Sequence, residues 1–207
     1  MNDETDISIT ASCLIVNGSV YKDGIRTFSG EPGNLNNLLQ SVYSHFGFRY
    51  PKFYKMDNLS KLGWLATEIM LQHFNLAEKY PASGTGVVLS NANASLDTDR
   101  KYYDTVKDIP SPALFVYTLP NIVTGEICIR HCLKGENAFF VSEKFDAPFI
   151  HQYVSNMINN DILQCCICGW VDVLGDDYKA ALFLVEKEPG TAFTVESINK
   201  IYELENG

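Results

Sequence analysis

The stretch ILQCCICGWVDVL at residues 162–174 is followed, after a turn at Asp176 and Asp177, by KAALFLVE at residues 179–186. Each segment is a nearly continuous apolar run, which is typical of a strand buried on both faces of a sheet. We expect the two strands to pair antiparallel as a hairpin. In a chain whose upstream part alternates strand and helix, this hairpin favours an α/β fold.

Upstream of the hairpin, apolar runs and helical periodicities alternate. Strands are predicted over residues 7–20, 85–89 and 137–141, with a further extended segment at 113–118. Helices are predicted over residues 34–44, 57–77, 96–106 and 120–132, after Asp146, and over 195–202. Asp57 and Asp146 are good N-cap residues, and proline is tolerated in a first helical turn. The sequence therefore predicts one domain over residues 1–207, with a five-stranded, mostly parallel mixed sheet and helices on both faces.

Composition and charge exclude several classes of function. The chain is 46% hydrophobic and 20% charged, as folded proteins are, and its formal net charge is −9. Such a charge repels phosphate backbones and anionic lipids, so neither nucleic acid nor membrane is expected as a partner. The first residues lack the basic and apolar parts of a secretory signal, which predicts a cytoplasmic protein. The short GTG at residues 84–86 is not a nucleotide-binding loop, and no cofactor is predicted.

The cysteines raise the question of a metal site. Cys165 cannot share a site with Cys166 and Cys168, because adjacent residues of a strand point to opposite faces. A four-thiolate zinc site from Cys128, Cys132, Cys166 and Cys168 is conceivable, but the usual tight spacing is absent. Buried, reduced thiols are the expected reading, and no metal is predicted.

Four stretches, the last of which overlaps the hairpin, carry a more specific signal. They are FYKMDNLSKLGWLATE (53–68), VVLSNANASLDTDRKYYDTV (87–106), SPALFVYTLPNIVTGEICIRHCLKGEN (111–137), and CGWVDV (168–173) with KAALFLVEKE (179–188). Their order and spacing resemble those of the β-ketoacyl synthases, the condensing enzymes of fatty-acid and polyketide synthesis, from near residue 8 to near residue 190. The resemblance implies the amino-terminal half of a thiolase-like fold.

The resemblance breaks at the family's nucleophile. Ketosynthases carry Val-Ser-Thr-Ala-Cys after the strand that follows a Gly-Pro-Asn turn, with the cysteine at the start of a buried helix. The matching segment here is VSEKF at 141–145, which places Phe145 at the nucleophile position between Lys144 and Asp146. Since no cysteine lies between residues 132 and 165, a small shift in alignment does not restore one. Phe145 would either fill the vacated pocket or gate an acyl tunnel formed with another subunit.

The family's catalytic histidines lie in a second half that this sequence does not contain. Condensation needs both the thiol and those histidines, so the resemblance predicts no catalytic residue in this chain. It also suggests a pocket lined by Tyr117, Leu119, Pro120 and Phe149.

The function implied is a non-catalytic, chain-length-factor-like partner in fatty-acid, polyketide or aryl-polyene-type acyl-chain synthesis. It would act as a homodimer or as a heterodimer with a ketosynthase, with an acyl carrier protein as a further partner. Two alternatives stay open. One is an acyltransferase of the 3-oxoacyl-carrier-protein synthase type, active only with a complementary subunit, and the other is a binder of a small apolar ligand in the vestigial pocket.

Overall fold

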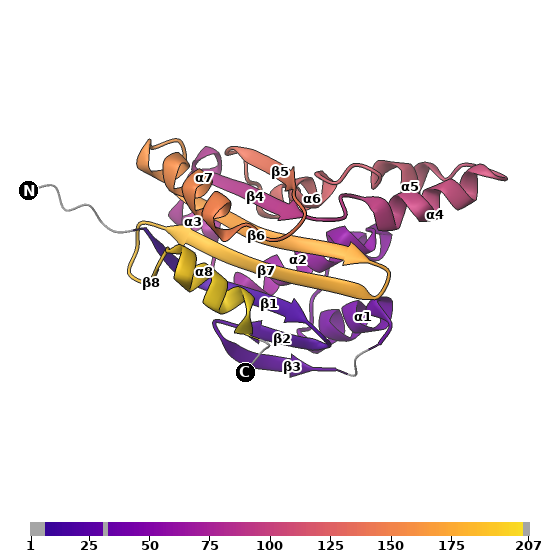
Figure 1. Cartoon of the computed structure of the whole chain (residues 1–207), viewed down its shortest axis with the longest axis horizontal. Coiled ribbons are helices and arrows are strands. Elements are labelled where there is room, and N and C mark those ends of the chain that lie inside the picture. Colours follow the sequence, from indigo (N-terminus) through magenta and orange to yellow (C-terminus); the bar gives the residue numbers. More distant parts are fainter. Residues whose placement is uncertain (1–6, 31–32, 205–207) are drawn as a thin grey trace, which may run out of the picture.

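One mixed β-sheet runs through the chain in the computed structural model, which describes residues 7–30 and 33–204 (Figure 1). Its strands are β1 (Ser8–Val16), β2 (Ser19–Lys22), β3 (Ile25–Ser29), β4 (Thr85–Asn91), β5 (Asn137–Val141), β6 (Cys165–Leu174), β7 (Asp177–Glu186) and β8 (Thr191–Ala192). The order across the sheet is β3-β2-β1-β7-β6-β4-β5, and β8 pairs with the start of β1. The hairpin of β6 and β7 lies at the centre and is antiparallel, as predicted.

The prediction of five mostly parallel strands is wrong on both counts. Within residues 7–30 and 33–204 the sheet has eight strands, and only the pairs β4–β5 and β4–β6 are parallel. Two tight turns account for two of the three additional strands, and the short β8 is the third. Asn17-Gly18 divides the segment expected as one strand into β1 and β2, and Asp23-Gly24 returns the chain into β3. All four turn residues have positive φ, the geometry that joins antiparallel strands closely and that Asn, Asp and Gly adopt most readily.

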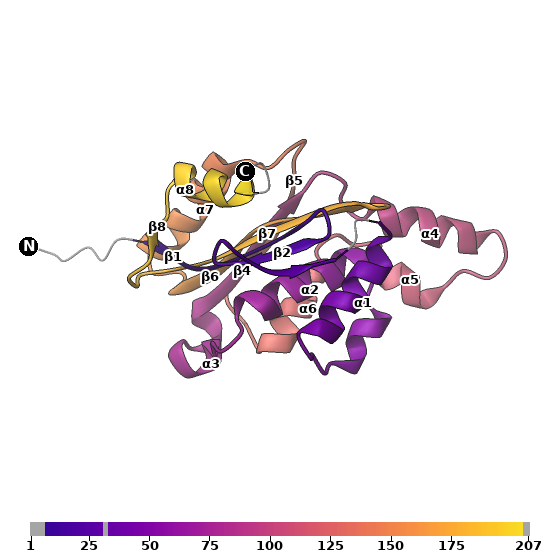
Figure 2. The same cartoon turned by 90° about the horizontal axis from the view of Figure 1, so that it is seen from below.

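Helices cover both faces of the sheet, which confirms that part of the prediction (Figure 2). They are α1 (Leu35–His45), α2 (Asn58–Met70), α3 (Leu76–Lys79), α4 (Leu96–Val106), α5 (Pro112–Val116), α6 (Ile122–His131), α7 (Ala147–Asn159) and α8 (Val195–Tyr202), with short 3₁₀ turns at Pro51–Lys55 and Ala82–Gly84. Figure 2 shows α1, α2 and α6 on one face and α7 with α8 on the other. The pair α4 and α5 projects from the end of the sheet as an arm (Figure 1).

Capping side chains set where several helices begin. The Asp57 carboxylate accepts a hydrogen bond from the backbone N–H of Ser60 at 2.9 Å, and Asp146 accepts one from Phe149 at 2.9 Å. Both caps confirm the prediction. The extended segment expected at 113–118 is wrong, since Ser111 caps a helix there and the following proline occupies its first turn. The helix predicted to reach residue 77 ends at Met70.

The sheet separates two hydrophobic cores. Cys165 belongs to the core under α1, α2 and α6, whereas Cys166 and Cys168 belong to the core under α7 and α8. Alternation of side chains along β6 is therefore confirmed. On the first face α2 packs tightly on α6, because a Cβ atom at Gly63 would lie 2.4 Å from Cγ2 of Val123. No helix within residues 7–30 and 33–204 combines the length and apolar character needed to cross a bilayer.

Candidate functional site: the β5–α7 connection

The connection from β5 to α7 lies where the parallel strands of the sheet end. In parallel strands the carboxyl ends meet at one edge, where open α/β sheets commonly place their ligands. Val141 ends β5 opposite Asn91, the last residue of β4. The backbone N–H of Ser142 then donates to the carbonyl of Asn91 at 2.9 Å. The segment carrying Phe145 is thus held at this edge of the sheet.

Phe145 is half-buried in a cluster of aromatic rings. Its ring stacks on Tyr202 of α8 with centroids 4.4 Å apart and planes inclined by 21°. Trp170 of β6 and Phe183 of β7 lie beneath it at 6.0 and 6.5 Å. The ammonium of Lys179 lies 3.9 Å from the centroid of the Tyr202 ring. Contacts from β6, β7 and α8 therefore hold the ring of Phe145 in place.

The neighbours of Phe145 are engaged in local structure. The Asp146 carboxylate caps α7, and the Ser142 hydroxyl donates to the carbonyl of Lys144 at 2.9 Å. The helix that follows buries Ile150 and Val154 on the sheet, so its first turn is fixed relative to Phe145. The connection supplies a capped helix start without a nucleophilic side chain in its first turn.

The cysteine thiols lie elsewhere. Cys132 is exposed and Cys128 is half-buried, whereas Cys13, Cys165, Cys166 and Cys168 are buried as structural residues are. Burial raises the pKa of Cys13, Cys128 and Cys165, and a hydrogen bond with Cys168 together with burial raises that of Cys166. A thiol with a raised pKa carries little thiolate at neutral pH and is a poor nucleophile.

The four-thiolate zinc alternative is contradicted by the placement of the cysteines. Cys128 packs against the core on one face of the sheet, while Cys166 and Cys168 lie in the core on the other. Within the described ranges, 7–30 and 33–204, no group of three or more His, Cys, Asp or Glu side chains is arranged to hold a metal ion.

The residues suggested as a pocket lining do not come together within the chain. Tyr117 is buried on the α2 face, where its hydroxyl donates to Glu126 at 3.1 Å, and Leu119 is exposed. Pro120 is half-buried in the segment between α5 and α6. Phe149 lies on the opposite face and packs edge-on against Phe140, with centroids 4.8 Å apart. A shared lining stays a prediction about an assembly.

Two buried carboxylates anchor α6, which follows the arm. Glu126 lies 2.7 Å from the ammonium of Lys52. Glu68 of α2 accepts hydrogen bonds from the guanidinium of Arg130 at 3.0 and 2.9 Å and lies 2.9 Å from Nε2 of His131. Burial acts to raise the pKa of Glu68, but His131 and Arg130 outweigh it and hold the pKa below its usual range. These pairs fasten α6 to the body of the molecule.

One side chain that sequence analysis did not single out fixes the loop between β4 and α4. The Asp172 carboxylate of β6 accepts hydrogen bonds from the backbone N–H groups of Ala92 (3.2 Å) and Asn93 (3.0 Å) and from the Asn93 amide (2.8 Å). Asn91 bonds in both directions with Ala94, whose φ is +48°. A run of small and amide residues, NANAS, is the one local sign of such a loop. Its partner lies 80 residues away in sequence and carries no local signal.

Comparison with known proteins identifies the fold. No protein-family model matches the chain, and no curated protein matches it in sequence. Among solved structures it is similar to the ishigamide ketosynthase/chain length factor, with a TM-score of 0.59 at 17% identity over 87% of this chain and 62% of that chain. It is also similar to a β-ketoacyl synthase from Burkholderia phymatum STM815, with a TM-score of 0.60 at 12% identity over 88% of this chain and 59% of that one.

A third match covers nearly the whole of both aligned chains. In the complex of the ketosynthase ApeO with its chain length factor ApeC from Xenorhabdus doucetiae, one chain aligns with a TM-score of 0.58 and 10% identity, over 98% of this chain and 92% of that one. The present chain thus spans about three fifths of the first two structures and nearly all of the third. At these identities the likeness establishes architecture alone. The chain has the thiolase-like fold of ketosynthases and chain length factors, as the resemblance predicted.

Proposed function

We propose that the chain is a non-catalytic, chain-length-factor-like partner of a ketosynthase in acyl-chain synthesis of the fatty-acid, polyketide or aryl-polyene type. The observation that carries the proposal is an uncovered apolar surface on the α4–α5 arm, next to an edge strand of the sheet. The proposal includes a cytoplasmic setting and an acyl carrier protein as a further partner.

The arm exposes a group of large apolar side chains. We call the following set the arm surface: Tyr103, Val106, Ile109, Phe115, Val116 and Leu119. Ile109 is 78% exposed and Phe115 59% exposed. Scattered apolar residues are normal on a surface, but a group on one projecting element marks a site of protein contact. The arm surface supports a protein partner.

The strand β5 offers a second contact next to the root of the arm. It is the last strand at its edge of the sheet, and Val141 at its end is 56% exposed. An edge strand presents unpaired backbone groups that a strand of another chain can complete. Among the strands of the described part of the chain, β5 pairs with β4 alone, and β4 leads directly into the arm, so one partner would cover both features.

The expected loss of the nucleophile supports the non-catalytic role. In the alignment of VSEKF with the family segment, Phe145 takes the place of the ketosynthase cysteine, and its ring lies in an aromatic stack. The net charge of −9 also disfavours self-association, because two copies repel each other. A ketosynthase with a less acidic contact surface is therefore the favoured partner over a second copy.

Co-expression with each ketosynthase encoded near the gene tests the proposal. We expect one of them to co-purify in a 1:1 complex, measured by size-exclusion chromatography with light scattering. The double variant Ile109→Asp/Phe115→Asp should lose the complex, since it places two charges in a dry contact. Ile25→Asp is the matched control, because Ile25 is 70% exposed at the opposite edge of the sheet. A chain that stays monomeric with every candidate contradicts the proposal.

Transfer of a labelled acyl group separates this role from the acyltransferase alternative. With the complex and a radiolabelled acyl carrier protein, the label should appear on the ketosynthase and not on this chain. Covalent label on this chain would favour the acyltransferase. An apolar acid that co-purifies with the isolated chain and is released by Phe145→Trp would favour the small-ligand alternative.

A further inference from the structure

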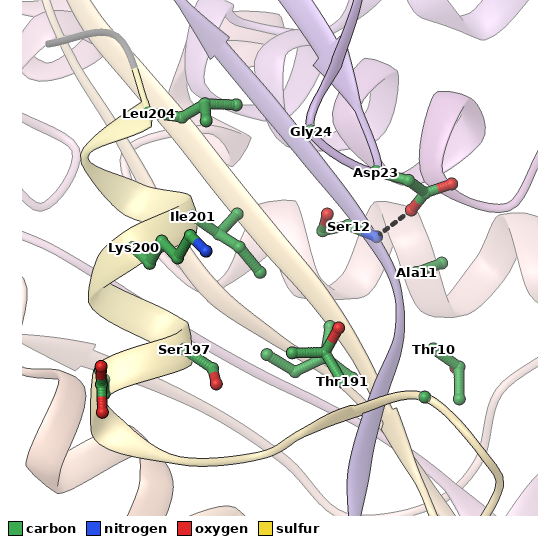
Figure 3. A pocket seen from close by; sticks show the side chains of 13 residues that line it. Thr10, Ala11, Ser12, Asp23, Gly24, Thr191, Ser197, Lys200, Ile201 and Leu204 are labelled. Atoms are coloured by element: carbon green, nitrogen blue, oxygen red, sulfur yellow. Dashed lines mark hydrogen bonds between the residues drawn. The ribbon is translucent and has the colours of Figure 1, made fainter. Parts of the chain in front are cut away.

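A groove of about 670 Å³ lies between β1 and α8 (Figure 3). The helix α8 packs on the core with one face and lines the groove with another. Ile198 and Tyr202 point to the core and to Phe145, whereas Ser197, Lys200 and Ile201 line the groove. The groove is therefore separate from the β5–α7 connection and from the arm. Its volume falls in the range typical of small-molecule sites.

The floor of the groove is a gap in strand pairing along β1. On this side of β1, β8 pairs with Ser8 and Ile9, and pairing with β2 begins only at Cys13. The register with β7 on the other side shifts between Ile9 and Ala11, which makes Thr10 a bulge. Bulges recur next to functional sites because they redirect side chains and interrupt pairing.

A buried polar cluster fixes the bulge from the far side of the sheet. The Thr10 hydroxyl donates to the carboxylate of Glu186 at 2.5 Å, and Glu186 is only 1% exposed. The same carboxylate accepts hydrogen bonds from the ammonium of Lys79 at 2.8 Å and from the hydroxyl of Tyr80. With a buried carboxylate fully engaged, the floor has one defined shape.

The two walls are equally fixed. The backbone N–H of Ser12 donates to the Asp23 carboxylate at 2.7 Å, and the N–H of Asp23 donates back to the carbonyl of Ser12 at 3.0 Å. On the other side a Cβ atom at Gly190 would lie 2.6 Å from the carbonyl oxygen of Ile9, so this close approach requires glycine. The groove is preformed, and a ligand would bind without first ordering it.

The lining combines an apolar surface with a cation. Figure 3 shows Lys200 and Ile201 of α8, and Leu204 just beyond the end of that helix, extending toward β1. Of the described residues that line the groove, Lys200 alone carries a positive charge. The acidic residues are Glu196, one helical turn before Lys200, and Asp23, whose carboxylate is held by Ser12 and lies 3.5 Å from Lys22.

We propose that this groove binds an amphipathic carboxylic acid. The carboxylate pairs with the ammonium of Lys200 and the hydroxyl of Ser197, and the apolar tail lies over Ile9, Ile201 and Leu204. An ion pair with a hydrogen bond orients the head group, and removal of apolar area from water supplies the affinity. The proposal does not depend on a ketosynthase partner.

Titration of the full chain with decanoate, followed by calorimetry, tests the site. We expect saturable 1:1 binding, weakened about tenfold in Lys200→Gln by loss of the ion pair. Lys107→Gln is the control, because it removes the same charge from a mostly exposed lysine on the arm. Decanol should bind the wild type more weakly than decanoate does, and this preference should vanish in Lys200→Gln.

A second variant blocks the groove without touching the core. Thr191 is exposed on β8 and lines the groove, so Thr191→Trp should abolish binding while the melting temperature stays unchanged. No saturable binding of decanoate to the wild type would overturn the proposal. So would binding that is unchanged in Lys200→Gln or in Thr191→Trp. Loss of the ketosynthase complex would leave these results unaffected, so the two proposals fail separately.

Discussion

The helices α7 and α8, which cover one face of the sheet, and the α4–α5 arm are both rich in apolar side chains, but those of the cover are buried and those of the arm are exposed. In the cover, Ile150, Val154 and Ile198 are fully buried against the sheet. In the arm, Ile109 and Phe115 face solvent. The apolar side chains of the cover are thus buried within the chain itself, whereas those of the arm are left exposed.

This difference limits how a partner can bind. A half of a thiolase-like fold without its second half would be expected to leave one sheet face bare, and pairing through that face would follow. Here α8 closes the face together with α7 (Figure 2). The Tyr202 ring of α8 stacks on Phe145. The uncovered apolar surface is on the arm instead. Contact through the arm and β5 is thus better supported than stacking on the covered face.

The sharpest test of the comparison is the same truncation in both regions. Ile198→Ala in the cover should lower the free energy of unfolding by about 3 kcal/mol, because it removes fully buried methyl groups and leaves a cavity. Ile109→Ala in the arm should change it by less than about 0.5 kcal/mol. Urea denaturation of the isolated chain measures both. Similar losses in the two variants would mean that the arm surface is already covered.

Phe145 tests whether the stack stabilises the cover. Phe145→Ala should lower the free energy of unfolding by about 2 kcal/mol, less than for a fully buried ring because Phe145 is half-buried. Tyr202→Ala should cost a similar amount, and the double variant should cost less than the sum, since both remove the same contact. Strict additivity in thermal unfolding would contradict direct stacking.

Local chemistry predicted the elements of the cover better than their arrangement. The helix predicted over 195–202 is confirmed as α8, and Asp146 caps α7 as expected, because periodicity and capping depend on neighbouring residues. Strand order could not be predicted in this way, since it depends on pairing between distant segments. The short apolar run at 113–118 was misread because a run of that length fits a strand or a helix turn, and the Ser-Pro pair before it selects the helix.

The candidate site likewise combines local features that the sequence predicts with long-range contacts that it does not predict. The similarity of VSEKF to a family segment drew attention to Phe145, but the contacts of its ring with Tyr202 and Trp170 join parts of the chain up to 57 residues apart. Glu186 and Asp172 gave no signal at all. In a sequence, a single carboxylate in an apolar run indicates only the end of a strand, because the distant groups that donate hydrogen bonds to it carry no local signal.

The rigidity of the arm depends on the loop that precedes it. Asp172→Asn keeps the shape of the side chain but replaces a carboxylate oxygen with a donor that faces the Asn93 amide. We expect a loss of about 1 kcal/mol in the free energy of unfolding and faster hydrogen exchange at the start of α4. Asp177→Asn at the exposed hairpin is the control. Unchanged exchange in α4 would show that the loop is held by other contacts.

The smallest effect concerns Asp57, which joins the body to the arm by capping α2 and accepting a hydrogen bond from Thr98 of α4 at 2.8 Å. Burial raises the pKa of Asp57, and hydrogen bonds from Ser60 and Thr98 only partly offset this. Because its pKa is higher in the folded chain than in the unfolded one, the folded state binds the proton more tightly. The free energy of unfolding therefore decreases as the pH rises from the pKa of an unfolded aspartate, about 4, toward the higher pKa of Asp57 in the folded chain.

Asp57→Asn removes the charge and keeps a cap of equal quality. We expect the variant to be more stable than the wild type at pH 7, by less than about 1 kcal/mol, with the difference vanishing below about pH 4. Urea denaturation at several pH values measures this difference. A variant that is less stable at pH 7 and equal to the wild type at low pH would show that the ionised carboxylate, rather than the neutral one, holds the arm to α2.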